Sequence, residues 1–129
     1  MNSPVNSGLT EPEVLSVDRQ PEQVVVQLRV PPELRWFEGH FPGTPLLPGV
    51  VQTTWVAQFG RRFFDLPPDF LSMSNMKFMR FILPDARIAL HLRYFPAKGE
   101  VAFEYREGGQ ASASGRMRFG HHDQSGSNT

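Results

Sequence analysis

One segment of this chain has helical spacing, whereas its other patterned segments alternate. From Pro48 to about Phe64 there is no internal proline, and the apolar residues recur as on a helix. Pro48 suits the first turn of such a helix, and Pro67-Pro68 ends the segment. Since apolar residues occur on nearly all of its sides, we expect protein to surround most of this helix.

Strand patterns dominate the rest of the chain between its ends. Apolar and polar residues alternate with a period of two, which is typical of strands with one buried and one more exposed face. The alternating stretches are 24–30, 76–82, 88–95, 101–106 and 111–119. Turns at 96–99 and 107–109 fit hairpins. The pattern predicts an α+β fold in which an antiparallel β-sheet wraps around one long central helix.

The length and the two ends of the chain predict a single domain. With 129 residues, of which 40% are hydrophobic, the chain is long enough to bury a true core. Residues 1–10 and 121–129 are small and polar, so we expect flexible ends and one domain over residues 11–120. The adjacent His121 and His122 lie in that tail without a third ligand, and no metal site is expected there.

Charge and cysteine content exclude several classes of function. Thirteen basic and thirteen acidic residues give no net charge, so a global field that attracts nucleic acid or an anionic membrane is absent. The chain has no cysteine, which excludes disulfides, thiolate metal sites and a cysteine nucleophile. We see neither a signal peptide nor a membrane-spanning run, and therefore expect a cytoplasmic protein.

The segment from Gly39 to Gln58, GHFPGTPLLPGVVQTTWVAQ, carries the strongest functional signal. Three prolines and three glycines constrain its backbone just before the predicted helix. A loop constrained in this way holds a side chain, here His40, in one place, as catalysis requires. A histidine with an ordinary pKa of ~6.5 can act as a base at neutral pH.

This segment resembles the motif of the hotdog-fold 3-hydroxyacyl-acyl-carrier-protein dehydratases, which is close to GHFPGxPxxPGVLxxEAxAQ. The matching positions are His40-Phe41-Pro42-Gly43, Pro45, Pro48-Gly49-Val50 and Ala57-Gln58. Residues 47–52, LPGVVQ, together with Trp55, are similar to the aryl-polyene dehydratase-like branch. The likeness covers about residues 13–119, and outside the loop it is a likeness of pattern.

The resemblance implies a dimer with active sites at the subunit interface. It makes His40 the general base, and the Gly49 amide at the helix start the donor to the thioester carbonyl. Phe41, Pro48, Val50 and Gln58 would line the substrate site. The implied assembly is a homodimer or a dimer of dimers that works with acyl carrier protein. The substrate is carried on the phosphopantetheine of acyl carrier protein or on coenzyme A, and neither a cofactor nor a metal is expected.

Thr54 departs from the family pattern. The acidic residue that protonates the leaving hydroxyl falls at this position, and no residue from Val50 to Phe59 is Asp or Glu. Threonine is far too weak an acid, although it can position a water, and Glu38 is a weak substitute. Three readings stay open: a differently assisted dehydratase, a thioesterase, or an inactive subunit that binds acyl carrier protein or pairs with an active homologue. For Thr53 and Thr54, helix packing with a hydroxyl bond to the preceding turn is the competing role.

Other candidates are less specific. An acyl tunnel has possible lining residues that the sequence cannot rank: Phe41, Leu46, Leu47, Phe59, Phe78 and Phe81. Arg61, Arg62, Lys77 and Arg80 suggest a patch for an acidic carrier, but solvated charges are the favoured interpretation. We interpret His91, within an alternating stretch, as structural.

Overall fold

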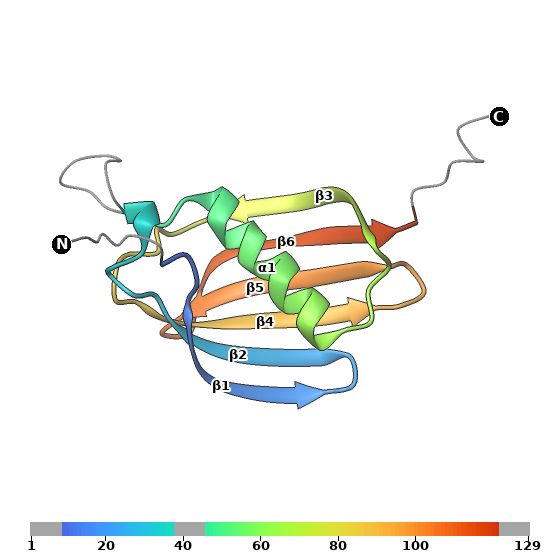
Figure 1. The fold of residues 1–129 in the computed structure, drawn as a ribbon, viewed down its shortest axis with the longest axis horizontal. Coiled ribbons are helices and arrows are strands. Elements are labelled where there is room, and N and C mark those ends of the chain that lie inside the picture. The colour runs from blue at the N-terminus through green and yellow to red at the C-terminus, as the bar shows by residue number, and fades with distance from the viewer. Residues whose placement is uncertain (1–8, 38–45, 122–129) are drawn as a thin grey trace.

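The computed structural model describes residues 9–37 and 46–121, which form one six-stranded antiparallel sheet and one long helix (Figure 1). The strand order is β1-β2-β4-β5-β6-β3. The elements along the chain are β1 (Glu13–Gln20), β2 (Gln23–Arg29), the short 3-10 helix η1 (Arg35–Phe37), α1 (Gly49–Phe63), β3 (Asp69–Phe78), β4 (Arg87–Phe95), β5 (Glu100–Glu107) and β6 (Gln110–Gly120). This arrangement confirms the predicted α+β architecture.

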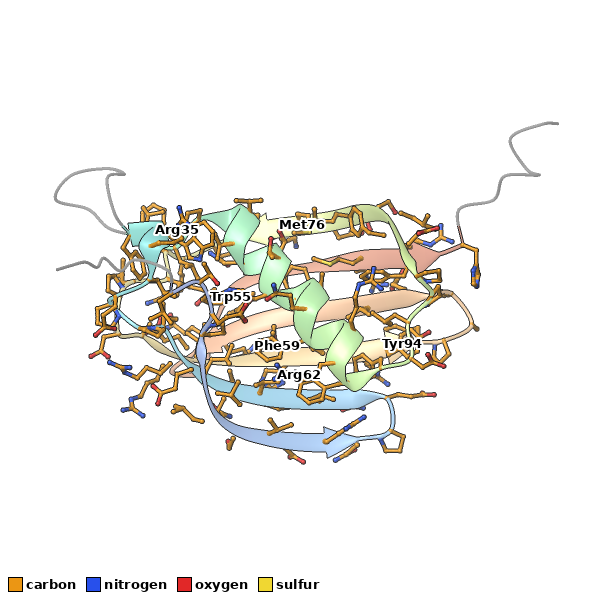
Figure 2. The ribbon with its side chains drawn as sticks, in the orientation of Figure 1. Arg35, Trp55, Phe59, Arg62, Met76 and Tyr94 are labelled. Atoms are coloured by element: carbon orange, nitrogen blue, oxygen red, sulfur yellow. The ribbon has the colours of Figure 1, made fainter. Side chains whose placement is uncertain are left out.

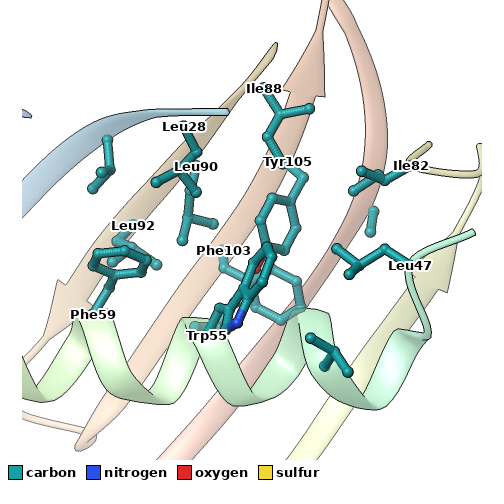
Figure 3. Close-up of a cluster of buried hydrophobic side chains, with 14 of the residues drawn as sticks. Leu28, Leu47, Trp55, Phe59, Ile82, Ile88, Leu90, Leu92, Phe103 and Tyr105 are labelled. Atoms are coloured by element: carbon teal, nitrogen blue, oxygen red, sulfur yellow. The ribbon is translucent and has the colours of Figure 1, made fainter. Parts of the chain in front are cut away.

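The core lies between α1 and one face of the sheet (Figure 3). Trp55, Val56 and Phe59 are buried on the helix, one turn or less apart. Alternate residues of the central strands meet them, because successive side chains of a strand point to opposite faces. The buried set on β2 and β4 is Val24, Val26, Leu28, Ile88, Leu90 and Leu92. Period-two alternation in the sequence therefore marked the correct face of these strands.

A buried tyrosine ties the helix to the sheet. Tyr105 of β5 is fully buried, and its hydroxyl donates a 2.6 Å hydrogen bond to the main-chain carbonyl of Gln52 in α1. Burial raises the pKa of Tyr105 well above its ordinary value, so the hydroxyl keeps the proton that it donates. This bond locates the first turns of α1 relative to the central strands.

One face of α1 is open, which corrects the expectation that protein surrounds most of the helix. Val50 is 70% exposed, and Thr54 and Gln58, at successive steps of four residues, are also exposed. These positions share one helix face. The sheet covers the opposite face, and among residues 9–37 and 46–121 no second layer covers this one. We call Val50, Thr54 and Gln58 the open stripe.

Two strands differ from the predicted pattern. The stretch predicted at 76–82 is wrong in its bounds, since β3 runs from Asp69 to Phe78. The amides of Met79 and Arg80 both donate to the Ser112 carbonyl, at 2.8 and 3.1 Å, and the strand ends there. β1 was not predicted, because a bulge between Val14 and Ser16 breaks its alternation and both of its faces are exposed.

The two hairpin turns offer a matched test of backbone strain. Gly99 and Gly108 both have positive φ, 63° and 58°. An added Cβ at Gly99 would collide with the carbonyl oxygen of Phe119, whereas nothing lies within 4 Å at Gly108. Gly108→Ala should lower the free energy of unfolding by about 1 kcal/mol, the cost of the left-handed backbone. Gly99→Ala should lower it clearly further in urea denaturation. Equal losses would contradict the collision.

Candidate functional site

The predicted site residues divide into those that the structure describes and those that it does not. His40 and Phe41 lie outside the described residues, and so does Glu38. Pro48, Gly49, Val50, Thr54 and Gln58 all lie at the start of α1 or on it. The described part of the site is therefore one helix with the elements that surround it.

The start of α1 presents amide groups that have no acceptor within the helix. Pro48 is the N-cap residue, with φ −62° and ψ 147°, and it provides no side-chain cap. Its carbonyl accepts the N–H groups of Val51 and Gln52, at 3.1 and 3.2 Å. Because the first amides of a helix have no intrahelical acceptor, the N–H groups of Gly49 and Val50 can bind a ligand. The positive end of the helix dipole favours a negatively charged oxygen there.

A cavity of about 340 Å³ opens beside this helix start. Its lining residues are Leu46, Leu47, Gly49, Gln52, Phe78, Met79, Arg80 and Phe81. We call it the helix-start cavity. It brings together four of the tunnel candidates, whereas Phe59 packs in the core instead. The ring of Phe78 lies 3.0 Å from where a Cβ on Gly49 would be, so a side chain at position 49 would push this ring aside.

Gln52 contributes a buried amide to the same cavity. Its Nε2 donates to the Leu47 carbonyl at 3.2 Å, which holds the chain just before Pro48. Its Oε1 is buried and has no hydrogen-bond partner among the described residues. A buried acceptor of this kind calls for an explanation, and a donor on a bound ligand would satisfy it.

A second cavity of about 340 Å³ lies along the open stripe. Its lining residues are Thr10, Glu11, Trp36, Val50, Val51, Thr54, Trp55 and Gln58. We call it the helix-face cavity. It unites three predicted site residues, Val50, Thr54 and Gln58, and it adds the acidic residue Glu11. Sequence reasoning missed Glu11 because no motif or spacing links residue 11 to the helix.

The two threonines of α1 make the hydroxyl bonds expected for helix packing. Thr53 and Thr54 both donate to the Val50 carbonyl, at 3.0 and 2.8 Å. Thr53 is buried, whereas Thr54 is exposed and lines the helix-face cavity. Since its proton is engaged with the backbone, Thr54 presents an acceptor oxygen to the cavity and no acid.

The basic side chains considered for carrier binding make contacts within the chain. Arg61 donates to the carbonyls of Pro67 and Pro68, and Arg80 contacts Gln110. Arg62 stacks on Phe59, with its guanidinium carbon 5.4 Å from the ring centre. These contacts favour the interpretation of ordinary surface charges.

The described residues contain neither a metal-binding cluster nor a membrane-spanning helix. No group of three His, Asp or Glu side chains in ranges 9–37 and 46–121 is placed to hold a metal ion. In the same ranges, no helix is long and apolar enough to cross a membrane.

Comparison with solved structures supports the predicted relationship. The dehydratase heterocomplex ApeI:P from Xenorhabdus doucetiae superposes with a TM-score of 0.81 and 28% identity, over 86% of this chain and 99% of that one. An uncharacterised protein from Erwinia carotovora gives a TM-score of 0.75 and 36% identity, over 84% and 95%. Mouse thioesterase superfamily member 2, at 15% identity and a TM-score of 0.62, shows the shared fold alone.

Sequence comparison also finds similarity to dehydratases. The dehydratase FabZ, which acts on 3-hydroxyacyl-acyl-carrier-protein, is 32% identical in Oenococcus oeni over 87 residues, or 62% of this chain and 63% of that protein. The Lactococcus lactis protein is 27% identical over 94 residues, 65% of each chain. This chain thus spans less than two thirds of these curated relatives.

The model of the ApeI-like family, described as ApeI dehydratase, matches residues 16–116. The chain therefore belongs to the ApeI-like family of hotdog-fold dehydratases.

Proposed function

We propose that this protein dehydrates 3-hydroxyacyl thioesters in fatty acid or polyene biosynthesis. The acyl group would be carried on the phosphopantetheine of acyl carrier protein or on coenzyme A, and no further cofactor takes part. The observation that carries this proposal is the amide of Gly49 at the start of α1, beside an apolar cavity and directly after the His40 motif. Family membership supports it.

The chemistry of the reaction fits these groups. A proton next to a thioester carbonyl is weakly acidic, so its removal needs a base and a stabilised enolate. In the proposal His40 removes the proton, and the amide at the start of α1 stabilises the oxyanion. Glycine at position 49 lets the thioester approach the amide closely. Leu46, Phe78 and Phe81 offer apolar surface to the acyl chain.

The open stripe supports assembly with a second chain. Val50 is 70% exposed, and the edge strand β3 displays further apolar side chains, among them Phe70, Met73 and Phe78. Burying such a surface is favourable because apolar area is removed from water. Exposed apolar patches of this kind mark interaction sites. We propose a homodimer or dimer of dimers, in the cytoplasm, that receives its substrate from acyl carrier protein.

The direct test is turnover of 3-hydroxyacyl thioesters of different chain lengths, on acyl carrier protein and on coenzyme A. The wild-type chain should form the 2-enoyl product, detected by its absorbance or by mass spectrometry. His40→Ala should lower the rate by roughly 10²- to 10⁴-fold, the usual contribution of a positioned base.

His91→Ala is the matched control, because His91 is exposed on β4 and away from both cavities. It should keep the wild-type rate. Equal rates for wild type and His40→Ala would remove His40 from the mechanism, and a wild type without turnover would overturn the proposal.

A second candidate function is that of a subunit without its own acid, paired with another hotdog chain. Thr54 favours it, since this residue lines the helix-face cavity and its hydroxyl bonds the backbone. The similar ApeI:P structure is a dehydratase heterocomplex. The thioesterase hypothesis has no comparable support, because the thioesterase structures that resemble this chain share only their fold with it.

Replacement of Thr54 by Glu separates the two candidates. If the chain is a subunit without an acid, the purified wild type should bind acyl carrier protein without turnover, and Thr54→Glu should create activity. Thr54→Gln, of similar size and without an acidic proton, should remain silent. Robust turnover by the purified wild type alone would contradict the function of a subunit without its own acid.

A further inference from the structure

The helix-face cavity is lined by an acidic residue, Glu11, that the family motif does not supply. Glu11 lines this cavity together with Thr54 and Gln58, the residues that occupy the family's acid position and the next turn of the helix. Trp36 and Trp55 also line it and give it apolar walls. An acidic residue from the segment before β1 thus lines the same cavity as the position from which an acid is missing.

The backbone on both sides of Glu11 is held in place. The carbonyl of Thr10 accepts the indole N–H groups of both Trp36 and Trp55, at 3.2 and 3.1 Å. One indole comes from η1 and the other from α1, and the segment before β1 passes beside η1 (Figure 1). Two donors from separate elements on one carbonyl fix the chain immediately before Glu11.

Further contacts complete this attachment. The Leu9 carbonyl accepts the amide of Arg35 at 3.0 Å, and the guanidinium of Arg35 lies 5.6 Å from the ring centre of Trp36. Figure 2 labels Arg35 and Trp55, which belong to the two elements that hold this segment. Pro12, which is buried, follows Glu11 and restricts it to extended backbone. Contacts of Leu9, Thr10 and Pro12 therefore hold the backbone on both sides of Glu11.

We propose that Glu11 is the general acid of this site and takes the part of the carboxylate that Thr54 replaces. This inference rests on the proposed dehydratase function. The base removes the proton from C2 of the acyl chain, and the electron pair forms the C2–C3 double bond. The C3–O bond breaks, and the carboxyl group of Glu11 gives its proton to the departing oxygen, so that water leaves. Solvent then returns a proton to Glu11 and takes one from the base.

The neighbours of Glu11 fit this role. Thr54 offers an acceptor oxygen, because its own proton is bonded to the Val50 carbonyl. The 3-hydroxyl group of the substrate can donate to that oxygen while its own oxygen faces the acid. Gln58, one turn further along α1, lines the cavity with an amide that can hold the same hydroxyl. Thr54 and Gln58 are therefore positioning residues for the leaving group.

The test compares leaving groups. The 3-hydroxyacyl thioester that the wild type dehydrates fastest is assayed beside its 3-acetoxy counterpart, from which acetate departs without needing a proton. Glu11→Gln should slow the loss of water by roughly 10²- to 10⁴-fold and leave the loss of acetate close to the wild-type rate. Glu11→Asp keeps a carboxyl group and should fall between them.

The control is Glu33→Gln, which removes a carboxylate from the loop before η1. Glu33 is exposed and lines neither the helix-start cavity nor the helix-face cavity. Thermal unfolding of each variant shows that it is folded. A Glu11→Gln enzyme that dehydrates at the wild-type rate would overturn the role of Glu11. An equal decrease in the rates of water and acetate release would overturn it too, because it indicates a structural effect. A wild type that releases neither water nor acetate would instead overturn the proposed function.

Discussion

The hydrogen bond from the Tyr105 hydroxyl to the Gln52 carbonyl joins α1 to the sheet, and the position of the site depends on it. Both groups are buried, and the bond is 2.6 Å long. A buried donor or acceptor left without a partner costs about 1–3 kcal/mol, so the helix has little freedom to shift along β5. Gln52 extends the same constraint to the loop, since its side chain donates to the Leu47 carbonyl. Sheet, helix and loop thus meet at one residue.

The surroundings of Gly49 at the helix start depend on the end of β3 as well. Phe78 is the last residue of β3, and its ring packs against the place where a side chain on Gly49 would be. β3 is also an edge of the sheet, with Phe70, Leu71 and Met73 exposed along it. An edge strand with exposed apolar side chains can pair with a strand of another chain. A strand that joins two copies would therefore also carry the residue that covers the helix start, which links assembly to the site.

Local chemistry explains which elements could be predicted from the sequence. β2, β4 and β5 bury alternate residues, so their period is visible, and Pro48-Gly49 marks the start of α1 through constraints that act within two residues. β1 escaped prediction because it has a bulge and no buried face. Glu11 escaped for a different reason. Its attachment depends on indole groups of Trp36 and Trp55, and only the fold brings these to Thr10. His40, predicted from the motif, stays a prediction.

The exchange of an acid for Thr54 is physically consistent with an acid at position 11. A carboxylate at position 54 would share the helix-face cavity with that of Glu11, and like charges in one small cavity repel each other. Threonine removes that repulsion and is also shorter, which leaves room for a side chain that enters from the segment before β1. A flexible arm would lose side-chain and backbone entropy on each approach to substrate. The two indole bonds to Thr10 and the following Pro12 meet much of that cost when the protein folds. Loss of the helix acid and fixation of Glu11 are therefore complementary features of one site.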